Sequence, residues 1–560
     1  MRILLLCHSF NSLSQRVHAE LRAAGHDVSV ELDIGDEVTR EALALFEPDA
    51  LVAPFLKRRI ADDVWQAVPC LIVHPGPPGD RGANALDWAV LETEPRWGVS
   101  IIRATGELDG GPLLASREFT MRRARKSSLY RFEVTEAAVS AVLEALDALA
   151  GGARPAADPP SGRWRDPVPA EARRIDWQTD ATARALRKID SADGQPGAQA
   201  LLAGRELRLF DARVEPELRG EPGALLARCR EAVCVATRDG ALWIGRLQEV
   251  APETFKRAAV DVLGDAAAGL DEIEPSLNAA EDGRGAITYR EHGDVGTIDF
   301  DFYNGAMSRR ACDELLAAWR HATGRPTRVI VLAGGLDFWS NGMDLNAIEA
   351  ADSPADASWA NIQAIDDVAA ALIATTSHLT VSALRGNAAA GGVFLALAAD
   401  RVWARDGVVL NPHYKNMGNL YGSEYWTYLL PRRVGAEGVA RVMDHRLPML
   451  AGRAAELGLV DAVGPNPPDA FDEFVLEHAA ELGDDAWQQR IADKRDRRTA
   501  DETDKPLADY RAEELERMRM NFYGFDPSYH VARYRLVKRT PHAWTPLYLA
   551  RHRRVSEKTA

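Results

Sequence analysis

The first quarter of the chain alternates short apolar runs with amphipathic stretches. An apolar run at residues 2–7 is followed by a polar turn, by an amphipathic stretch at 15–24 that stops at a glycine, and by a second apolar run at 28–30. This order predicts a β-α-β unit, which is how an open parallel sheet begins. Two further buried strands are predicted at 50–53 and 70–73, because each apolar run ends where polar residues or glycines begin.

The middle and later parts of the chain show other patterns. Short strand-like segments at 206–210, 232–236 and 241–244 alternate with turn signals, which predicts a small β-rich domain. Beyond it, strand-like runs at 296–300 and 328–332 are interleaved with helical stretches, so we expect a second mixed α/β region.

Changes in composition divide the chain. Residues 151–160 are rich in Pro, Gly and Ala, as in a linker, and acids and glycines cluster over 271–285. From about Asp484 the chain is strongly charged with a helical pattern. We predict a multidomain α/β protein with a Rossmann-like domain at 1–155, a small β-barrel (OB-like) domain at 160–265, a further domain at 285–485 and a C-terminal helical extension at 486–560.

The composition is that of a folded, acidic protein. The 560 residues are 46% hydrophobic and 27% charged, with a formal net charge of −16. A nucleic-acid binder needs a basic field, so this charge argues against nucleic acid as a partner, although local basic clusters can bind a small polyanion. The five cysteines lack paired metal spacing, which argues against a disulfide scaffold or a metal site. The N-terminal apolar run is too short for a signal peptide or a membrane span, so we expect a cytoplasmic protein.

His74 and Asp109 form the first candidate site. His74 directly follows a predicted strand and precedes a Pro-Gly turn, at the edge of a sheet where ligands gather. Asp109 precedes two glycines, where a backbone can approach a ligand closely. Such a pair can share proton transfer around a carbonyl group. Taken alone, a His after a strand is more often structural, and an Asp-Gly-Gly tripeptide is usually a turn.

Several segments around this pair resemble the folate-dependent formyltransferases in order and spacing. The segments are Arg81-Gly-Ala-Asn-Ala-Leu-Asp-Trp-Ala89, Gly98-Val-Ser-Ile101 and Asp109-Gly-Gly-Pro-Leu-Leu114, followed by Arg174-Ile-Asp-Trp177 and Gln195-Pro-Gly-Ala198. The last two are similar to the β-barrel domain of methionyl-tRNA formyltransferase. The resemblance covers about the first 260 residues.

This resemblance implies chemistry on 10-formyltetrahydrofolate. In the family an Asn, a His and an Asp act on that folate, and the last two match His74 and Asp109. The Asn position falls on Ile72, which removes an amide that would help to stabilise a developing oxyanion. Formyl transfer is still expected, but an amine acceptor is less so. Arg81 and Gly82 are predicted to bind the folate.

Two glycine-containing motifs mark the second candidate site. Ser340-Asn-Gly-Met-Asp-Leu345 follows a predicted strand, and Ala390-Gly-Gly-Val-Phe394 opens an apolar stretch about 50 residues later. A Gly-Gly turn that opens a buried helix presents free N–H groups to an anion. The backbone amides of Asn341 and Gly391 are therefore predicted to form an oxyanion hole around a thioester carbonyl. Either motif alone is more typical of helix–sheet packing.

The pair of motifs resembles the crotonase, or enoyl-CoA hydratase/isomerase, superfamily, over roughly residues 290 to 465. The segment Ala451-Gly-Arg-Ala-Ala-Glu-Leu-Gly-Leu-Val-Asp461 is also similar to that family. In its hydratases two glutamates activate water, and their places here fall on Phe394 and His413. The resemblance therefore implies a crotonase scaffold with changed chemistry.

A polar loop is predicted to supply the replacement chemistry. Residues 411–425 follow an apolar run and contain Tyr414 and Glu424, with two glycines between them. A Tyr/Glu couple can pass a proton to or from a thioester carbon. Packed tyrosines with Glu424 at a helix start are an equally good interpretation of the same residues.

The order of the two halves resembles one family, the hydrogenase maturation factors HypX/HoxX, over nearly the whole chain. Asn411-Pro-His-Tyr-Lys-Asn-Met-Gly418 and Tyr421-Gly-Ser-Glu-Tyr-Trp426 carry that resemblance. It implies formyl transfer from 10-formyltetrahydrofolate to coenzyme A, then decarbonylation of formyl-CoA to carbon monoxide (CO) for a nickel-iron hydrogenase. It also implies that Tyr414 and Glu424 are the decarbonylation pair and that hydrogenase maturation proteins are partners.

Basic residues are the candidates for the coenzyme A phosphates. Clusters at 122–126 and 533–539 carry several cations each, and phosphates favour such groups. Arg131, Arg533 and Arg535 are the residues predicted to bind the cofactor. Solvated surface charge is the more frequent role of such clusters.

Two other functions stay open from sequence. One is a fused enzyme that formylates an amine and hydrates or isomerises an acyl-CoA, which a second acid opposite Tyr414 would favour. The other is a non-catalytic maturation scaffold, which solvent-closed clefts at His74 and Tyr414 would favour.

Overall fold

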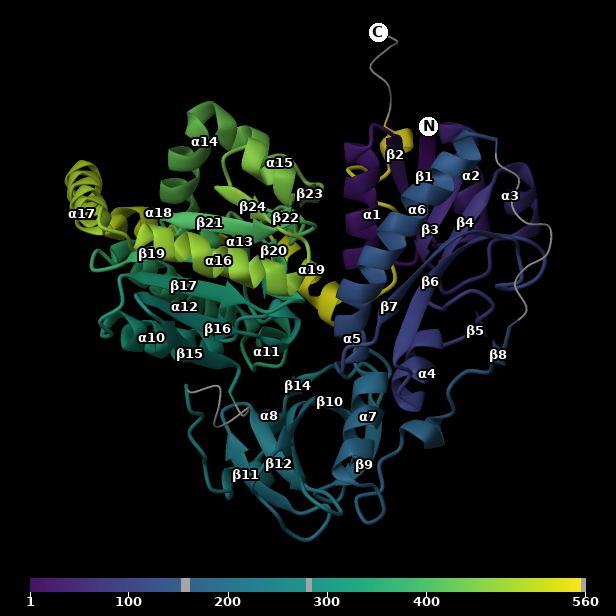
Figure 1. The fold of residues 1–560 in the computed structure, drawn as a ribbon, viewed down its shortest axis with the longest axis horizontal. Helices are drawn as coiled ribbons and strands as arrows, with labels where there is room; N and C mark the ends of the chain where they lie inside the picture. Colours follow the sequence, from purple (N-terminus) through teal and green to yellow (C-terminus); the bar gives the residue numbers. More distant parts are fainter. Residues whose placement is uncertain (153–161, 278–284, 555–560) are drawn as a thin grey trace.

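The computed structural model describes residues 1–152, 162–277 and 285–554. It contains three sheet-based units and a set of C-terminal helices (Figure 1). The predicted linker at 151–160 lies almost wholly outside the described residues, and the predicted boundary at 271–285 lies partly outside them. None of the described helices is both long and apolar enough to cross a membrane.

The N-terminal unit is a six-stranded sheet in the order β2-β1-β3-β4-β6-β7. Its strands are β1 (Arg2–Cys7), β2 (Asp27–Leu32), β3 (Ala50–Phe55), β4 (Cys70–His74), β6 (Arg96–Arg103) and β7 (Leu113–Thr120). The sheet is parallel from β2 to β4, as the pattern predicts, but β6 and β7 are antiparallel. These two strands follow each other through a short loop that holds Asp109, and such a loop can join only antiparallel neighbours.

Helices cover both faces of this sheet. Alternate residues of the strands point to opposite faces, so Ile3 and Leu5 pack with one set of helices while Leu4 and Leu6 pack with the other. The helices are α1 (Ser12–Ala23), α4 (Ala85–Glu92) and α6 (Thr135–Ala150) in the first set, and α2 (Asp36–Phe46) and α3 (Asp62–Ala67) in the second. Three shorter elements complete the unit, β5 (Arg81–Gly82), α5 (Lys126–Leu129) and the π-helix η1 (Tyr130–Val134).

The middle unit is an antiparallel sheet with a helix against it. The strand order is β11-β12-β13-β10-β9, with β14 beside β13. Its elements are β8 (Trp164–Arg165), η2 (Ala170–Arg173), α7 (Thr182–Ala192), β9 (Ala198–Leu202), β10 (Arg205–Glu215), β11 (Leu225–Cys229), β12 (Ala232–Ala236), β13 (Ala241–Glu249), β14 (Arg257–Ala258), α8 (Ala259–Leu263) and α9 (Asp265–Ala268). Of these, β8 pairs with β5 of the N-terminal unit, so the chain first returns to that unit.

The third unit has two sheets and a helical layer. The larger sheet has the order β15-β16-β17-β19-β21-β24, and the smaller has the order β18-β20-β22-β23. Its elements are β15 (Ile287–His292), β16 (Val295–Phe300), η3 (Tyr303–Gly305), α10 (Arg309–Thr323), β17 (Val329–Gly334), β18 (Phe338–Ser340), α11 (Leu345–Glu349), α12 (Pro354–Ala374), β19 (Leu379–Leu384), β20 (Asn387–Ala389), α13 (Gly391–Leu397), β21 (Arg401–Arg405), β22 (Val409–Asn411), α14 (Trp426–Met443), β23 (Met449–Leu450), α15 (Ala451–Glu456) and β24 (Ala462–Gly464). The wholly buried α13 lies within its largest core cluster.

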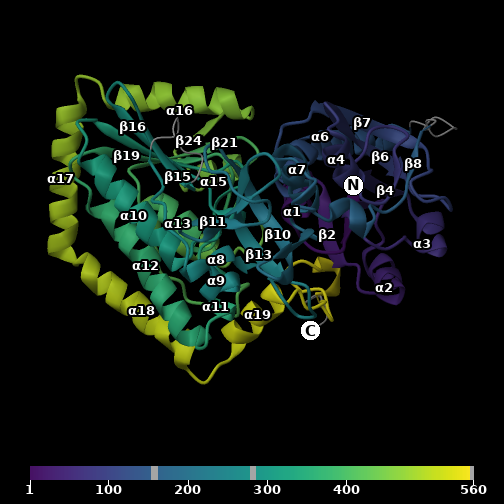
Figure 2. The ribbon, with the colours of Figure 1, turned by 90° about the horizontal axis from the view of Figure 1, so that it is seen from below.

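The C-terminal helices wrap around the third unit. They are α16 (Pro468–Leu482), α17 (Trp487–Asp504), α18 (Leu507–Tyr523) and α19 (Ser528–Val537), followed by η4 (Arg551–Arg553). Figure 2 shows α17, α18 and α19 running in succession along the outside of this unit. Because α18 packs beside α12 and contributes Met518 and Phe522 to the core, the extension is built into the fold.

The end of the chain then returns to the N-terminal unit. Thr545, His552 and Arg553 all bond the carboxylate of Glu31 on the edge strand β2, and Leu549 accepts a hydrogen bond from Val30 N–H. Glu31 is fully buried. The tail therefore covers a strand edge and ties the two ends of the chain together.

Candidate active sites

The first site lies at the carboxyl end of β4. His74 is the last residue of that strand and is 5% exposed. Its Nε2 lies 3.0 Å from Asp80 Oδ1, and Arg165 Nε donates to Asp80 Oδ2 at 2.8 Å. Asp80 and Arg165 are both buried. A cation, a carboxylate and an imidazole thus form a chain that fixes one side of the His74 ring.

Asp109 approaches the other side of that ring. It has a left-handed backbone with φ of 49° in the loop between β6 and β7. Its Oδ2 lies 3.9 Å from His74 Nδ1 and accepts the N–H of Gly82 at 3.1 Å. A Cβ at Gly82 would lie 2.1 Å from the carbonyl oxygen of Arg165, so only glycine fits there. The structure therefore brings His74, Asp109 and Gly82 together.

Two residues of this site are missing from the sequence analysis. Asp80 ends the Pro-Pro-Gly turn that follows His74, and that closeness in sequence was the available signal. Arg165 lies beyond the linker and carries no such signal. Arg81, predicted to bind folate, donates instead to Glu107 Oε1 at 2.7 Å and is partly exposed.

The second site is centred on a buried Tyr–Glu contact. Tyr414 Oη lies 2.6 Å from Glu424 Oε2 and 3.0 Å from the carbonyl oxygen of Ser423. Tyr414 is 5% exposed and Glu424 is 1% exposed. Burial, followed by the nearby Asp366 carboxylate, raises the pKa of Glu424 to about 8. Burial and the Glu424 carboxylate also raise the pKa of Tyr414 well above its usual value.

The surroundings of this pair agree with the two sequence motifs. A Cβ on Gly391 would lie 2.0 Å from Glu424 Oε1, so the carboxyl group packs directly against the glycine that opens α13. The ring of Phe394 stacks on Tyr414 with centroids 5.3 Å apart. Phe394 is fully buried and fills the space beside the pair.

The prediction for the backbone amide of Asn341 requires a correction. Its N–H donates to the carbonyl oxygen of Gly305 at 2.7 Å, so it is already used within the fold. The Gly342 carbonyl and the Asp344 N–H bond the backbone of Met307 at 2.9 and 3.2 Å. Met343 lies between Gly342 and Asp344. In an extended segment its backbone N–H and C=O point to the opposite side, so the amide of Met343 is directed away from Met307.

His413 lies where the hydratases have a glutamate. It is buried, and neither ring nitrogen has a hydrogen-bond partner among the described residues. Burial and the neighbouring cation of Arg446 lower the pKa of His413 to about 4. The imidazole is therefore neutral near pH 7.

Most of the cations proposed for phosphates are engaged elsewhere. Arg533 is 4% exposed and pairs with Glu349 Oε2 at 2.8 Å, which corrects its prediction as a phosphate ligand. Arg535 is exposed near the end of α19. Arg131 bridges from the N-terminal unit to the third unit, where it donates to Asp337 at 3.1 Å and Asn304 at 2.7 Å.

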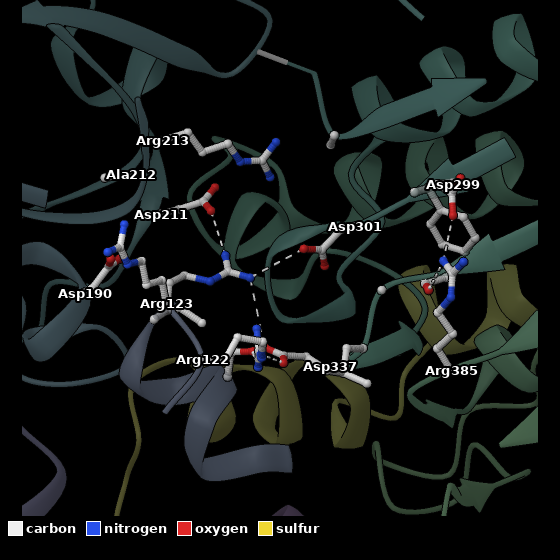
Figure 3. A pocket seen from close by; sticks show the side chains of 18 of the residues that line it. Arg122, Arg123, Asp190, Asp211, Ala212, Arg213, Asp299, Asp301, Asp337 and Arg385 are labelled. Carbon is white, nitrogen blue, oxygen red and sulfur yellow. Dashed lines mark hydrogen bonds and ion pairs between the residues drawn. The ribbon is translucent and has the colours of Figure 1, made fainter. Parts of the chain in front are cut away.

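In the cluster at 122–126, Arg125 links the three units. Arg125 pairs with Asp211 of the middle unit at 2.7 Å and with Asp301 and Asp337 of the third unit at 3.6 and 4.0 Å. Figure 3 shows these three carboxylates converging across a cavity of about 460 Å³. That cavity contains neither His74 nor Tyr414, so Arg125 serves the packing of the units.

Comparison with known proteins follows the same division of the chain. Family models match for formyl transferase at residues 1–146, for the formyl transferase C-terminal domain at 167–258, and for enoyl-CoA hydratase/isomerase at 292–523. A methionyl-tRNA formyltransferase of Anaeromyxobacter dehalogenans is 30% identical over 40% of this chain and 75% of its own length.

Two relatives match along the whole chain. The hydrogenase maturation factor HoxX of Bradyrhizobium diazoefficiens is 55% identical over 99% of this chain and 97% of its own. The crystal structure of HypX from Aquifex aeolicus in complex with tetrahydrofolic acid is 48% identical, covers 99% of both chains and superposes with a TM-score of 0.97. The chain therefore belongs to the HypX/HoxX family of hydrogenase maturation factors.

Proposed function

We propose that this protein moves the formyl group of 10-formyltetrahydrofolate to coenzyme A and then releases CO from formyl-CoA. In the first step the thiol S–H bond and a C–N bond of the folate break, a C–S bond forms, and the folate nitrogen gains the proton. In the second step the C–S and formyl C–H bonds break, the thiolate gains a proton, and coenzyme A is regenerated with CO. The buried contact between Tyr414 and Glu424 against Gly391 is the observation that carries this proposal.

The first step is assigned to His74 and Asp109. We assign Asp80 as the acceptor of a hydrogen bond from His74 Nε2–H, since its other carboxyl oxygen already accepts from Arg165; the lone pair of Nδ1 then lies on the side of Asp109. A base at this nitrogen can accept the thiol proton of coenzyme A as sulfur attacks the formyl carbon. The likeness to a tetrahydrofolate complex supports folate as the donor.

The second step is assigned to Tyr414 and Glu424. The phenol has one hydrogen but lies within bonding distance of two oxygens. Both contacts are satisfied if Glu424 donates its own proton to Tyr414 and Tyr414 donates to the Ser423 carbonyl. A Glu424 pKa of about 8 agrees with a protonated carboxyl near pH 7. The pair can therefore protonate the departing thiolate and regain a proton from the formyl C–H group.

Backbone amides are proposed to hold the thioester oxygen. Gly391 is the first residue of α13, so its N–H has no acceptor within the helix. Met343 is the proposed second donor, because the amide of Asn341 is already bonded. Such donors stabilise the charge that develops on the carbonyl oxygen.

Coenzyme A is proposed to place its phosphates at the junction of the units. Burial lowers the pKa of Lys256 to about 7; the Asp193 carboxylate opposes this shift, and the charges of Arg539, Arg131 and Arg125 contribute to it. Among the described residues, no carboxylate pairs with Arg539. Arg539 is therefore the cation we propose for a phosphate of coenzyme A, which supplies the thiol that carries the formyl group.

The test supplies the purified protein with coenzyme A and folate labelled at the formyl carbon. Labelled CO, detected as its haem complex, is the expected product. Label found only in formate would overturn the decarbonylation step. Omitting coenzyme A is the control, and CO should then be lost because the acceptor is missing.

The buried positions of His74, Tyr414 and Glu424 also favour a second candidate, a maturation scaffold without catalysis. The same experiment separates the two. A scaffold would bind folate or coenzyme A but return all of the label as unreacted folate.

A further inference from the structure

The loop that carries Glu424 has an unusual backbone. Glu424 and Tyr425 have φ values of 60° and 59°, so two successive residues with a Cβ lie in the left-handed region. Such residues rarely adopt this conformation without support from outside. The side-chain direction of Glu424 depends on it, because the carboxyl group must reach both Tyr414 and Gly391.

Helix α18 supplies much of that support. Glu514, Met518 and Asn521 have the spacing i, i+4 and i+7, which places them on one face of the helix. Each accepts backbone N–H groups of the loop. The contacts are Tyr425 N–H and Thr427 N–H to Glu514 (2.9 and 2.8 Å), Gly422 N–H to Met518 Sδ (3.2 Å) and Tyr421 N–H to Asn521 Oδ1 (3.0 Å).

Helix α12 holds the remaining part of the loop. Asp366 accepts the Ser423 hydroxyl at 2.7 and 2.8 Å and the Glu424 N–H at 2.9 Å. Asp366 and Glu514 are both fully buried. Neither carboxyl group is directed at Tyr414 as a second acid; both are used by the loop that presents Glu424.

We propose that Glu514 and Asp366 are positioning residues of the second site, and that α18 is thereby a working part of it. This inference rests on the proposed function of Tyr414 and Glu424. Helix α18 of the C-terminal extension and helix α12 of the third unit both accept hydrogen bonds from this loop. Removing either carboxyl group should release Glu424 from its left-handed conformation.

The two carboxyl groups also set the charge around Glu424. The titratable groups that face Glu424 are Asp366 from α12, Cys312 from α10, Glu514 from α18 and Tyr414 from its own loop, while Arg511 of α18 lies beside Asp366. The Asp366 carboxylate disfavours ionisation of Glu424, because like charges repel. Asp366→Asn should therefore lower the pH at which Glu424 loses its proton.

The experiment compares Glu514→Ala, Glu514→Gln and Asp366→Asn in the full-length protein. CO release from supplied formyl-CoA is measured against pH, and hydrogen–deuterium exchange is followed over residues 421–427. Glu513→Gln is the matched control, since Glu513 is exposed on the same helix and its ion pair within the described part of the chain is with Lys505. Formyl transfer at the first site reports that each variant is folded.

Glu514→Ala is expected to lower kcat by about 100-fold with a smaller change in KM, because misplacement of a catalytic group by about 1 Å has that effect. Glu514→Gln should recover part of the rate, since its amide oxygen can still accept one N–H. Asp366→Asn should shift the alkaline limb of the pH profile to lower pH, and exchange over 421–427 should rise in Glu514→Ala.

Wild-type rates and an unchanged pH profile in Glu514→Ala and Asp366→Asn would overturn the inference, even if the loop exchanges faster. If the wild-type protein releases no CO, the proposed function fails instead. Exchange over 421–427 then tests positioning alone, and unchanged protection in Glu514→Ala would overturn it. If Glu514→Ala does not fold, the inference is tested by the other two variants. A wild-type rate in Glu514→Gln together with an unshifted alkaline limb in Asp366→Asn would then overturn it.

Discussion

His74 and Asp80 are joined through a single ring nitrogen, with Nε2 3.0 Å from the carboxylate. The other carboxyl oxygen of Asp80 accepts a hydrogen bond from the guanidinium of Arg165 at 2.8 Å. In the proposed first step, Asp80 accepts from His74 Nε2–H, and the nitrogen nearer Asp109 acts as the base.

Asp80→Asn should therefore impair formyl transfer. The amide can donate to Nε2, which would favour the opposite tautomer and move the lone pair away from Asp109. We expect kcat to fall by about 10- to 100-fold with little change in KM. The assay is formation of formyl-CoA from labelled folate, with Asp62→Asn on the surface as the control. A normal rate would assign Asp80 to packing only.

Asp109→Ala should abolish formyl transfer but leave the second site active on supplied formyl-CoA. Asp109 contacts His74 and Gly82, whereas Tyr414 and Glu424 belong to another unit. Formyl-CoA formation and CO release are measured separately. Loss of both in a folded variant would indicate one composite site.

Tyr414→Phe and Glu424→Gln should each stop CO release while formyl-CoA accumulates. General acid–base groups typically contribute about 10²- to 10⁴-fold, so a loss of that size is expected. Tyr414→Phe keeps the ring that stacks on Phe394, and Glu424→Gln keeps the shape of the carboxyl group. Time-resolved mass spectrometry of acyl-CoA species beside CO detection checks this, and wild-type rates would make the pair structural.

The raised pKa of Glu424 predicts how stability depends on pH. Its folded pKa of about 8 lies above the ordinary value of 4.5, so its favourable contribution is full below pH 4.5 and is lost as pH rises through about 8. Glu424→Gln cannot ionise, so it should gain stability relative to wild type over this window. Thermal inactivation half-lives at pH 5 and pH 9 test the sign. A greater relative gain at pH 5 would contradict it.

The returning tail predicts a link between the two ends of the chain. Arg553→Ala leaves the buried Glu31 with less compensation, and breaking a buried pair typically costs about 3–5 kcal/mol. Arg551→Ala is the control, because its pair with Asp27 is largely exposed and is worth about 0–1 kcal/mol. The free energy of unfolding in urea is the measurement. Equal effects of the two changes would show that the tail contributes little.

The sequence by itself determined the local elements and the families. Apolar runs such as 2–7 and 70–73 became β1 and β4, because burial on both faces of a parallel sheet requires continuous apolar residues. The second glycine motif lies against the proposed second site, since Gly391 opens α13 beside Glu424. These signals are local: they depend on residues that are near one another in the chain.

Only the tertiary structure decided which polar groups work together. Glu424 is held by Asp366 and Glu514, far before and after it in the chain, and His74 is held through Asp80 by Arg165 beyond the linker. Likewise Arg533 pairs with Glu349 and is unavailable to a phosphate. Ion pairs and hydrogen bonds form between neighbours in space, and a charged residue carries no mark in the sequence of the partner that folding will bring to it.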